Sequence, residues 1–150
     1  MFGLHWAIVP FAIIALAKGE PTALLIAASV ASFAQTGAVG AVMLKTKDKR
    51  LRELAIPAFI SGWFGVTEPA IYGVNLIKGK GKPFLMGLAG GATGGFLASI
   101  FGLKASGMAV TVVPGMLLFL NAQMPLYLIS IIAASGVSFA LTYTMVKLDK

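Results

Sequence analysis

The sequence predicts an all-α integral membrane protein whose chain crosses the bilayer several times. Of its 150 residues, 58% are hydrophobic and only 11% are charged, and the mean hydropathy is +0.91. Soluble domains carry about 25% charged residues. Three uncharged stretches, residues 21–44, 83–103 and 125–146, each reach the roughly 20 residues that a helix needs to cross hydrocarbon. We therefore expect polytopic helices.

The first apolar stretch, residues 1–17, is shorter than these three. We interpret it as the end of a helix whose beginning is not in the sequence. A chain of 150 residues holds about four spans and their connections, which suits half of a transporter better than a whole one. We therefore expect a fragment or a subunit.

Two basic clusters, within residues 45–52 and 78–82, constrain the topology of the segment between them. Cationic loops stay in the cytoplasm, so both clusters should lie on the same side of the membrane. Residues 53–77 must then cross an even number of times, yet these 25 residues are too few for two spans. A re-entrant hairpin satisfies both conditions where protein or water satisfies its backbone. Its turn should fall near residues 65–69, because Gly65 permits unusual dihedral angles and Pro69 suits the first turn of a helix.

The remaining elements are less regular. Lys147 and Lys150 should return the last span to the cytoplasm, residues 104–121 suggest a second partial hairpin, and residues 45–54 suggest a short surface helix. Small residues at helical spacing in the span after the second basic cluster predict close helix contacts rather than ligand binding. They are Gly87, Gly90, Gly91, Gly94 and Gly95.

Glu68 is the main candidate for a functional residue. Its neighbours are apolar, and an ionisable group at membrane depth is costly unless it faces a polar cavity or a partner. A half-helix beginning at Glu68 and Pro69 would also direct unpaired backbone N–H groups into that cavity. His5 is the second candidate, because a carboxylate and an imidazole together match the donors and acceptors of a sugar. Aromatic residues could supply an apolar surface for the sugar ring, namely Trp6, Trp63, Phe64 and Tyr72.

Several candidates have an ordinary structural interpretation as well. His5 is open to interpretation as an interfacial or satisfied core histidine, and Trp6 and Trp63 as interface anchors. Thr67 suits the cap of the half-helix, and Asn75 suits a turn or cap. Gln35 and Thr36 are expected to form hydrogen bonds across helices.

Other kinds of chemistry find little support. One histidine and no cysteine provide no zinc set and no disulfide, and no phosphate-loop lysine follows the glycines, so we expect no metal and no cofactor. The net charge of +7 falls in short clusters rather than along one face, which argues against nucleic acid. Two functional classes stay open: a proton-coupled sugar carrier, since a cavity glutamate can titrate, and a truncated, non-catalytic membrane interaction module.

Four segments resemble one known family. They are residues 2–6, 45–52, 65–76 and 82–84, and they are similar to enzyme IIC, the membrane component of the bacterial phosphoenolpyruvate-dependent sugar phosphotransferase system (PTS). The likeness is to the beta-glucoside-type branch of the glucose superfamily, and it covers essentially the whole chain. The block around Thr67-Glu68-Pro69 is its most specific part.

The resemblance implies a dimeric protein of the bacterial plasma membrane in which re-entrant hairpins and several spans carry sugar against a scaffold, as in an elevator-type transporter. Residues 1–150 correspond to the C-terminal, sugar-carrying half of a IIC domain, without a IIA or IIB domain. The family's sugar-contacting glutamate and histidine map onto Glu68 and His5. We expect the site to comprise Glu68, His5, Thr67, Trp6 and Asn75.

The resemblance also implies partners. The sugar, a beta-glucoside or a related glucoside or disaccharide, is phosphorylated by a phosphocysteine on a IIB domain that a IIA domain charges. Both domains and the N-terminal half of IIC would come from outside this chain, so the enzymatic transferase activity would belong to the complex. The hypothesis that Glu68 also acts as a general base rests on proximity alone.

Overall fold

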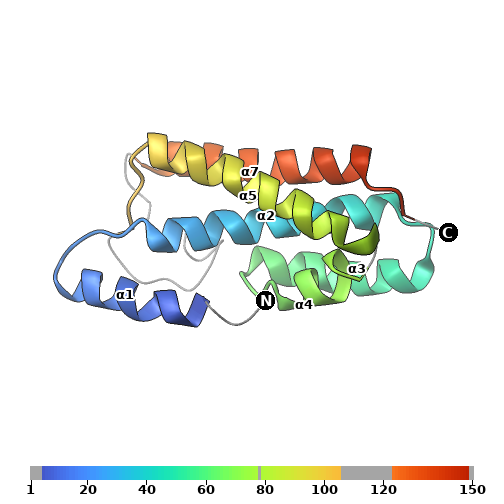
Figure 1. The fold of residues 1–150 in the computed structure, drawn as a ribbon, viewed down its shortest axis with the longest axis horizontal. Coiled ribbons are helices and arrows are strands. Elements are labelled where there is room, and N and C mark those ends of the chain that lie inside the picture. The colour runs from blue at the N-terminus through green and yellow to red at the C-terminus, as the bar shows by residue number, and fades with distance from the viewer. Residues whose placement is uncertain (1–4, 78, 106–122, 149–150) are drawn as a thin grey trace.

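The computed structural model describes residues 5–77, 79–105 and 123–148, and within these residues the protein is built from helices (Figure 1). The only β-type pairing in these ranges is one antiparallel bridge between Thr22 and Ala105. The predicted all-α class is therefore confirmed. In chain order the elements are α1 (His5–Ala17), α2 (Leu24–Lys45), α3 (Lys49–Trp63), α4 (Glu68–Ala70), the π-helix η1 (Ile71–Asn75), the 3₁₀ turn η2 (Gly79–Gly81), α5 (Lys82–Ile100) and α7 (Met124–Met145).

Helices α2, α5 and α7 run side by side along the whole length of the molecule (Figure 1). They are the described helices long and apolar enough to cross a membrane. The three spans predicted from the sequence are thus confirmed as apolar helices of membrane-crossing length. Helix α2 is the centre of the structure, because all of residues 33–42 are buried. Its 22 residues extend about 33 Å, close to the thickness of a bilayer's hydrocarbon core.

Glycines bring α5 close to its neighbours. A Cβ atom at Gly87 would collide with the Gln35 amide, and one at Gly90 would collide with the backbone of α7 at Ala134. Gly94 faces both α2 and α7 in the same way. The predicted close packing is therefore confirmed for these three glycines, which lie on the inner face of the helix. Gly91 is in ordinary contact, and Gly95 has no neighbour within 4 Å.

Helix α3 begins at Lys49, directly after the first basic connector. The Asp48 carboxylate starts it by accepting hydrogen bonds from the backbone N–H groups of Arg50 (3.0 Å) and Leu51 (3.4 Å). The expected separate surface helix at residues 45–54 is wrong, because these residues divide between the end of α2, the connector and the first turns of α3. One buried stripe runs along the whole of α3, which is why the helix continues without a break. The stripe is formed by Leu51, Ala55, Ala58 and Gly62.

The chain reverses after Trp63. Gly65 adopts a left-handed conformation with φ 84°, and the N–H of Val66 donates to the Ser61 carbonyl oxygen at 3.0 Å. Helix α4 then begins at Glu68, with Pro69 in its first turn. The predicted break near residues 65–69 is confirmed. Helices α3, α4 and η1 together form a helical hairpin that returns toward the end where α3 began (Figure 1).

Two basic connectors, one between α2 and α3 and the other between η1 and α5, lie at the same end of the bundle, next to the end of α7. The Lys45 amine donates hydrogen bonds to the backbone oxygens of Tyr143 and Val146, the latter at 2.7 Å. A Cβ atom at Gly79, in the second connector, would lie 2.7 Å from Cγ1 of the same Val146. At the opposite end, the Thr22–Ala105 bridge joins the segments before α2 and after α5. The predicted second hairpin at residues 104–121 lies outside the described residues except for Lys104 and Ala105.

Replacing Gly94 with alanine should lower stability. The new Cβ would lie 2.7 Å from Val30 Cγ1 and would also press on α7, an overpacking that costs about 1–3 kcal/mol. Gly95→Ala is the matched control, because the added methyl meets no atom within 4 Å and improves helix propensity by up to about 1 kcal/mol. Thermal unfolding in detergent, followed by circular dichroism, should show a lower midpoint only for Gly94→Ala. Equal midpoints for both variants would contradict the packing described above.

Candidate functional site

Glu68 lies at the tip of the hairpin, where α4 begins. Its side chain is exposed, whereas Ala70 and Val74 on the same arm are fully buried against α2 and α3. The arm is thus anchored by small apolar side chains on one face and presents its carboxylate from the other. This arrangement leaves Glu68 available to a ligand.

The hairpin tip lies at the middle of α2. Helices α2 and α3 are antiparallel, with Gly62 against Thr36 and the Phe59 ring against Gly40. At the tip, the Trp63 ring meets Phe33 edge to face, with 5.4 Å between ring centroids. Phe33 is twelve residues from Lys45, which corresponds to about 18 Å along the helix. Trp63 therefore lies far from either end of the bundle.

Three aromatic residues, Trp63, Phe64 and Tyr72, lie in or near the tip. Phe64 immediately follows Trp63 in the turn, and Tyr72 lies four residues after Glu68 on the returning arm. All three rings are more than one third exposed. These residues, together with the carboxylate, offer the combination of apolar surface and hydrogen-bond acceptor that a sugar requires.

Asn75 lies in a buried hydrogen-bond network. It ends η1, is fully buried, and its Nδ2 donates to the Gln35 backbone oxygen (3.0 Å) and to Gln35 Oε1 (2.8 Å). Gln35 Nε2 in turn donates to the Phe84 carbonyl oxygen in α5 at 3.3 Å. The expected cross-helix role of Gln35 is therefore confirmed, and Asn75 connects the returning arm to α2 instead of capping a turn.

Two smaller predictions are wrong. Thr67 stands at the N-cap of α4, but its side chain makes no capping hydrogen bond, because its backbone is already in the helical region with φ −97° and ψ −5°. The Thr36 hydroxyl donates to the Ser32 carbonyl oxygen of its own helix at 2.8 Å and does not bond across helices. Its contribution is steric, because it fills the space beside Gly62.

His5 and Trp6 open α1, and their side chains lie outside the described part of the structure. The backbone of α1 follows the half of the molecule that the hairpin leaves uncovered, so the start of α1 and the hairpin tip face the same middle zone along the long axis (Figure 1). Whether the imidazole approaches Glu68 stays a prediction.

Curated relatives match most of this chain. It is 44% identical over 121 residues to the PTS system beta-glucoside-specific EIIBCA component of Halalkalibacterium halodurans, covering 78% of this chain and 19% of that protein. It is 34% identical over 117 residues to the sucrose-specific EIIBC component of Salmonella typhimurium, covering 78% and 25%. It is also 40% identical over 100 residues to the trehalose-specific EIIBC component of Escherichia coli, covering 66% and 20%. No family model and no solved structure matches the chain.

The chain belongs to the sugar-specific enzyme II components of the PTS. It spans about a fifth to a quarter of the length of these relatives. The resemblance predicted from residues 2–6, 45–52, 65–76 and 82–84 is thereby confirmed. The relatives do not favour a proton-coupled carrier or a non-catalytic interaction module.

The sequence did not indicate that Asn75 and Gln35 form a pair in this enzyme II chain. The available signal was chemical: both amides stand within apolar stretches, and a buried amide needs a partner. It does not say which partner, because residues 35 and 75 belong to segments whose relative placement depends on the hairpin. The role of Lys45 at the end of α7 was missed for the same reason.

Replacing Asn75 with leucine should destabilise the hairpin. Gln35 Oε1 would keep its buried position without its donor, at a cost of about 1–3 kcal/mol. A double-mutant cycle with Gln35→Leu should give a coupling free energy of about 0.5–3 kcal/mol in detergent unfolding experiments. Thr93→Val is the control, since that hydroxyl bonds only to the Ala89 carbonyl of its own helix. Additive losses for Asn75 and Gln35 would show that the pair is not coupled.

Proposed function

We propose that this chain is the sugar-binding part of the IIC membrane component of a PTS permease for a beta-glucoside or a related disaccharide. It binds the sugar with Glu68 at the hairpin tip and presents it for phosphorylation on the cytoplasmic side. The phosphoryl group comes from a IIB domain that a IIA domain charges, and the N-terminal half of IIC completes the transport unit. The names of the relatives support the sugar class, because they are specific for beta-glucosides, sucrose and trehalose.

The depth of the hairpin is the observation that carries this proposal. Both ends of the hairpin lie at the basic end of the bundle, and its tip reaches Phe33, about half-way along a helix of membrane-crossing length. In a bilayer, such a segment is re-entrant and its tip lies near the midplane. Broken helices at this depth form the substrate sites of many transporters. Glu68 at that tip is best explained by a polar substrate.

The charge distribution supports a cytoplasmic location for the basic end. Among the described residues, that end carries eight of the cationic side chains, whereas the opposite end carries only Lys18 and Lys104. Lysine and arginine are enriched in cytoplasmic loops. The set at the basic end is Lys45, Lys47, Lys49, Arg50, Arg52, Lys80, Lys82 and Lys147.

Glu68→Gln should reduce sugar phosphorylation by the complete transporter by about 10- to 100-fold. A neutral amide replaces charge-assisted hydrogen bonds, which contribute about 1.5–3 kcal/mol each. The measurement is phosphoenolpyruvate-dependent phosphorylation of labelled sugar in membrane vesicles. Glu53→Gln, an exposed glutamate near the start of α3, is the matched control and should retain activity. Wild-type phosphorylation by a normally inserted Glu68→Gln transporter would refute the assigned role.

Membrane topology can be tested directly, because the chain has no cysteine of its own. Single cysteines at positions 47 and 80 should react with a membrane-impermeant maleimide only after cells are permeabilised, since a hairpin between them returns to the same side. A cysteine at position 104 should react in intact cells, because it lies at the other end of α5. Labelling of positions 47 and 80 from opposite sides would exclude a re-entrant hairpin.

A further inference from the structure

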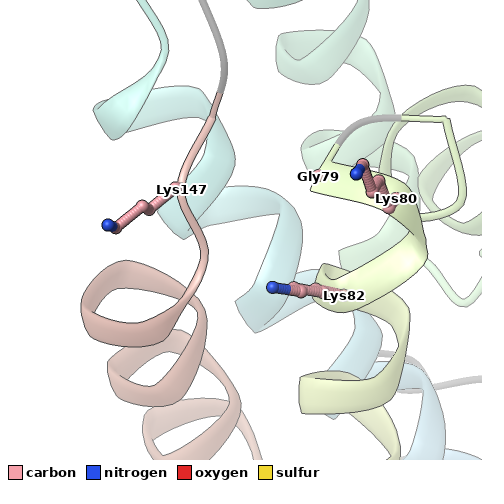
Figure 2. Close-up of a pocket in the computed structure, with 4 residues that line it drawn as sticks. All are labelled: Gly79, Lys80, Lys82 and Lys147. Atoms are coloured by element: carbon pink, nitrogen blue, oxygen red, sulfur yellow. The ribbon is translucent and has the colours of Figure 1, made fainter.

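A pocket at the basic end of the bundle is lined by three lysines. It has a volume of about 190 Å³, and its walls are Gly79, Lys80, Lys82 and Lys147. Figure 2 shows Lys80 and Lys82 on one side, carried by the connector into α5, and Lys147 on the other, carried by the segment after α7. The Lys82 amine extends into the gap between the two segments. Two parts of the chain that are distant in sequence therefore line one pocket, and in this view the Lys147 amine points away from Lys82 (Figure 2).

Contacts behind the pocket hold its two walls together. Gly79 packs so closely on Val146 that any larger residue would collide with it. The backbone oxygen of Val146 also accepts a hydrogen bond from the Lys45 amine at 2.7 Å. Lys147 comes directly after this anchored residue. The spacing of the walls is thus set by packing rather than by the lysine side chains themselves.

The backbone of the first wall is unusual. Gly79, Lys80 and Gly81 all have positive φ values, of 60°, 56° and 74°. The left-handed conformation suits the two glycines but is unfavourable for a lysine. The turn carries Lys80 and leads directly into Lys82, the first residue of α5. Strain of this kind is often retained where it positions a side chain for binding.

The charge of the pocket is not balanced by the described residues. Lys80, Lys82 and Lys147 are exposed, and none of the three amines has a carboxylate partner there. Asp149 lies outside the described residues. Ammonium groups bind phosphate as compact point charges, and the positive end of the α5 dipole adds to the attraction. A concavity lined by three lysines favours a phosphate-bearing ligand.

We propose that this pocket binds the phosphate group of an anionic membrane lipid such as phosphatidylglycerol. It lies where α5 begins and α7 ends, which is the level of the lipid headgroups if these helices span the bilayer. Lysines near an anionic leaflet each contribute about fivefold to lipid affinity. The inference rests on the membrane orientation in the proposed function, but it does not depend on sugar binding.

Lipid retention by the purified chain in detergent tests the proposal. Native mass spectrometry with added phosphatidylglycerol should show that the triple variant Lys80→Gln, Lys82→Gln, Lys147→Gln binds the lipid on the order of 100-fold more weakly than the unmodified chain. The matched control removes three charges from the same end but outside the pocket, as Lys47→Gln, Lys49→Gln, Arg52→Gln. The control should lose clearly less affinity than the pocket variant, because none of its three side chains lines the pocket. Neither variant should retain more phosphatidylcholine than the unmodified chain.

Three outcomes would overturn the assignment. Equal losses in the two triple variants would show a diffuse surface charge rather than a pocket. Competition by millimolar inorganic phosphate that removes the lipid from the unmodified chain would show a site for soluble phosphate. Unchanged lipid retention in a pocket variant with native circular dichroism would exclude any role of the three lysines. Failure of Glu68→Gln to impair phosphorylation would refute the proposed function alone, because that residue is remote from this pocket.

Discussion

The packing of α3 against the middle of α2 is the constraint on which the rest of the structure depends. Gly62 lies against Thr36 and Gly40 lies against Phe59, so the two helices approach closely along their shared length. Helices in hydrocarbon gain little from the hydrophobic effect, and close van der Waals contact is what holds them together. Because α3 ends at the level of Phe33, the chain must turn half-way along α2, and Glu68 lies in that turn.

Polar contacts then connect the returning arm to the bundle. Gln35 is bonded both to Asn75 at the end of η1 and to the Phe84 carbonyl at the start of α5. One buried side chain therefore joins three segments, and its hydrogen bonds are strong because little water competes for them. Apolar contacts alone would allow the arm to slide along α2. The directional bonds of the two amides fix its register and thus the height of the carboxylate.

The cationic residues serve different purposes at the same end of the molecule. Lys45 satisfies backbone oxygens at the end of α7 and so holds α2 and α7 together. The other cations at this end are mostly exposed. Their common position follows from the hairpin, which returns the chain to the side from which it came. A fold in which residues 53–77 ran the length of the bundle would separate the two basic clusters and remove both the hairpin tip and the lysine pocket.

Composition and short-range pattern determined much of this protein. The apolar stretches predicted the three long helices, because only a helix satisfies its own backbone in hydrocarbon. The spacing of the basic clusters predicted the hairpin, and Gly65 and Pro69 predicted where it turns. The block around Glu68 identified the family, since its residues are contiguous in the sequence. Tertiary structure alone decided that Asn75 pairs with Gln35, that Lys45 reaches Val146 and that Lys147 joins Lys80 and Lys82. Each of these contacts joins residues far apart in the chain, and their meeting depends on helix lengths and crossing geometry that no local pattern specifies.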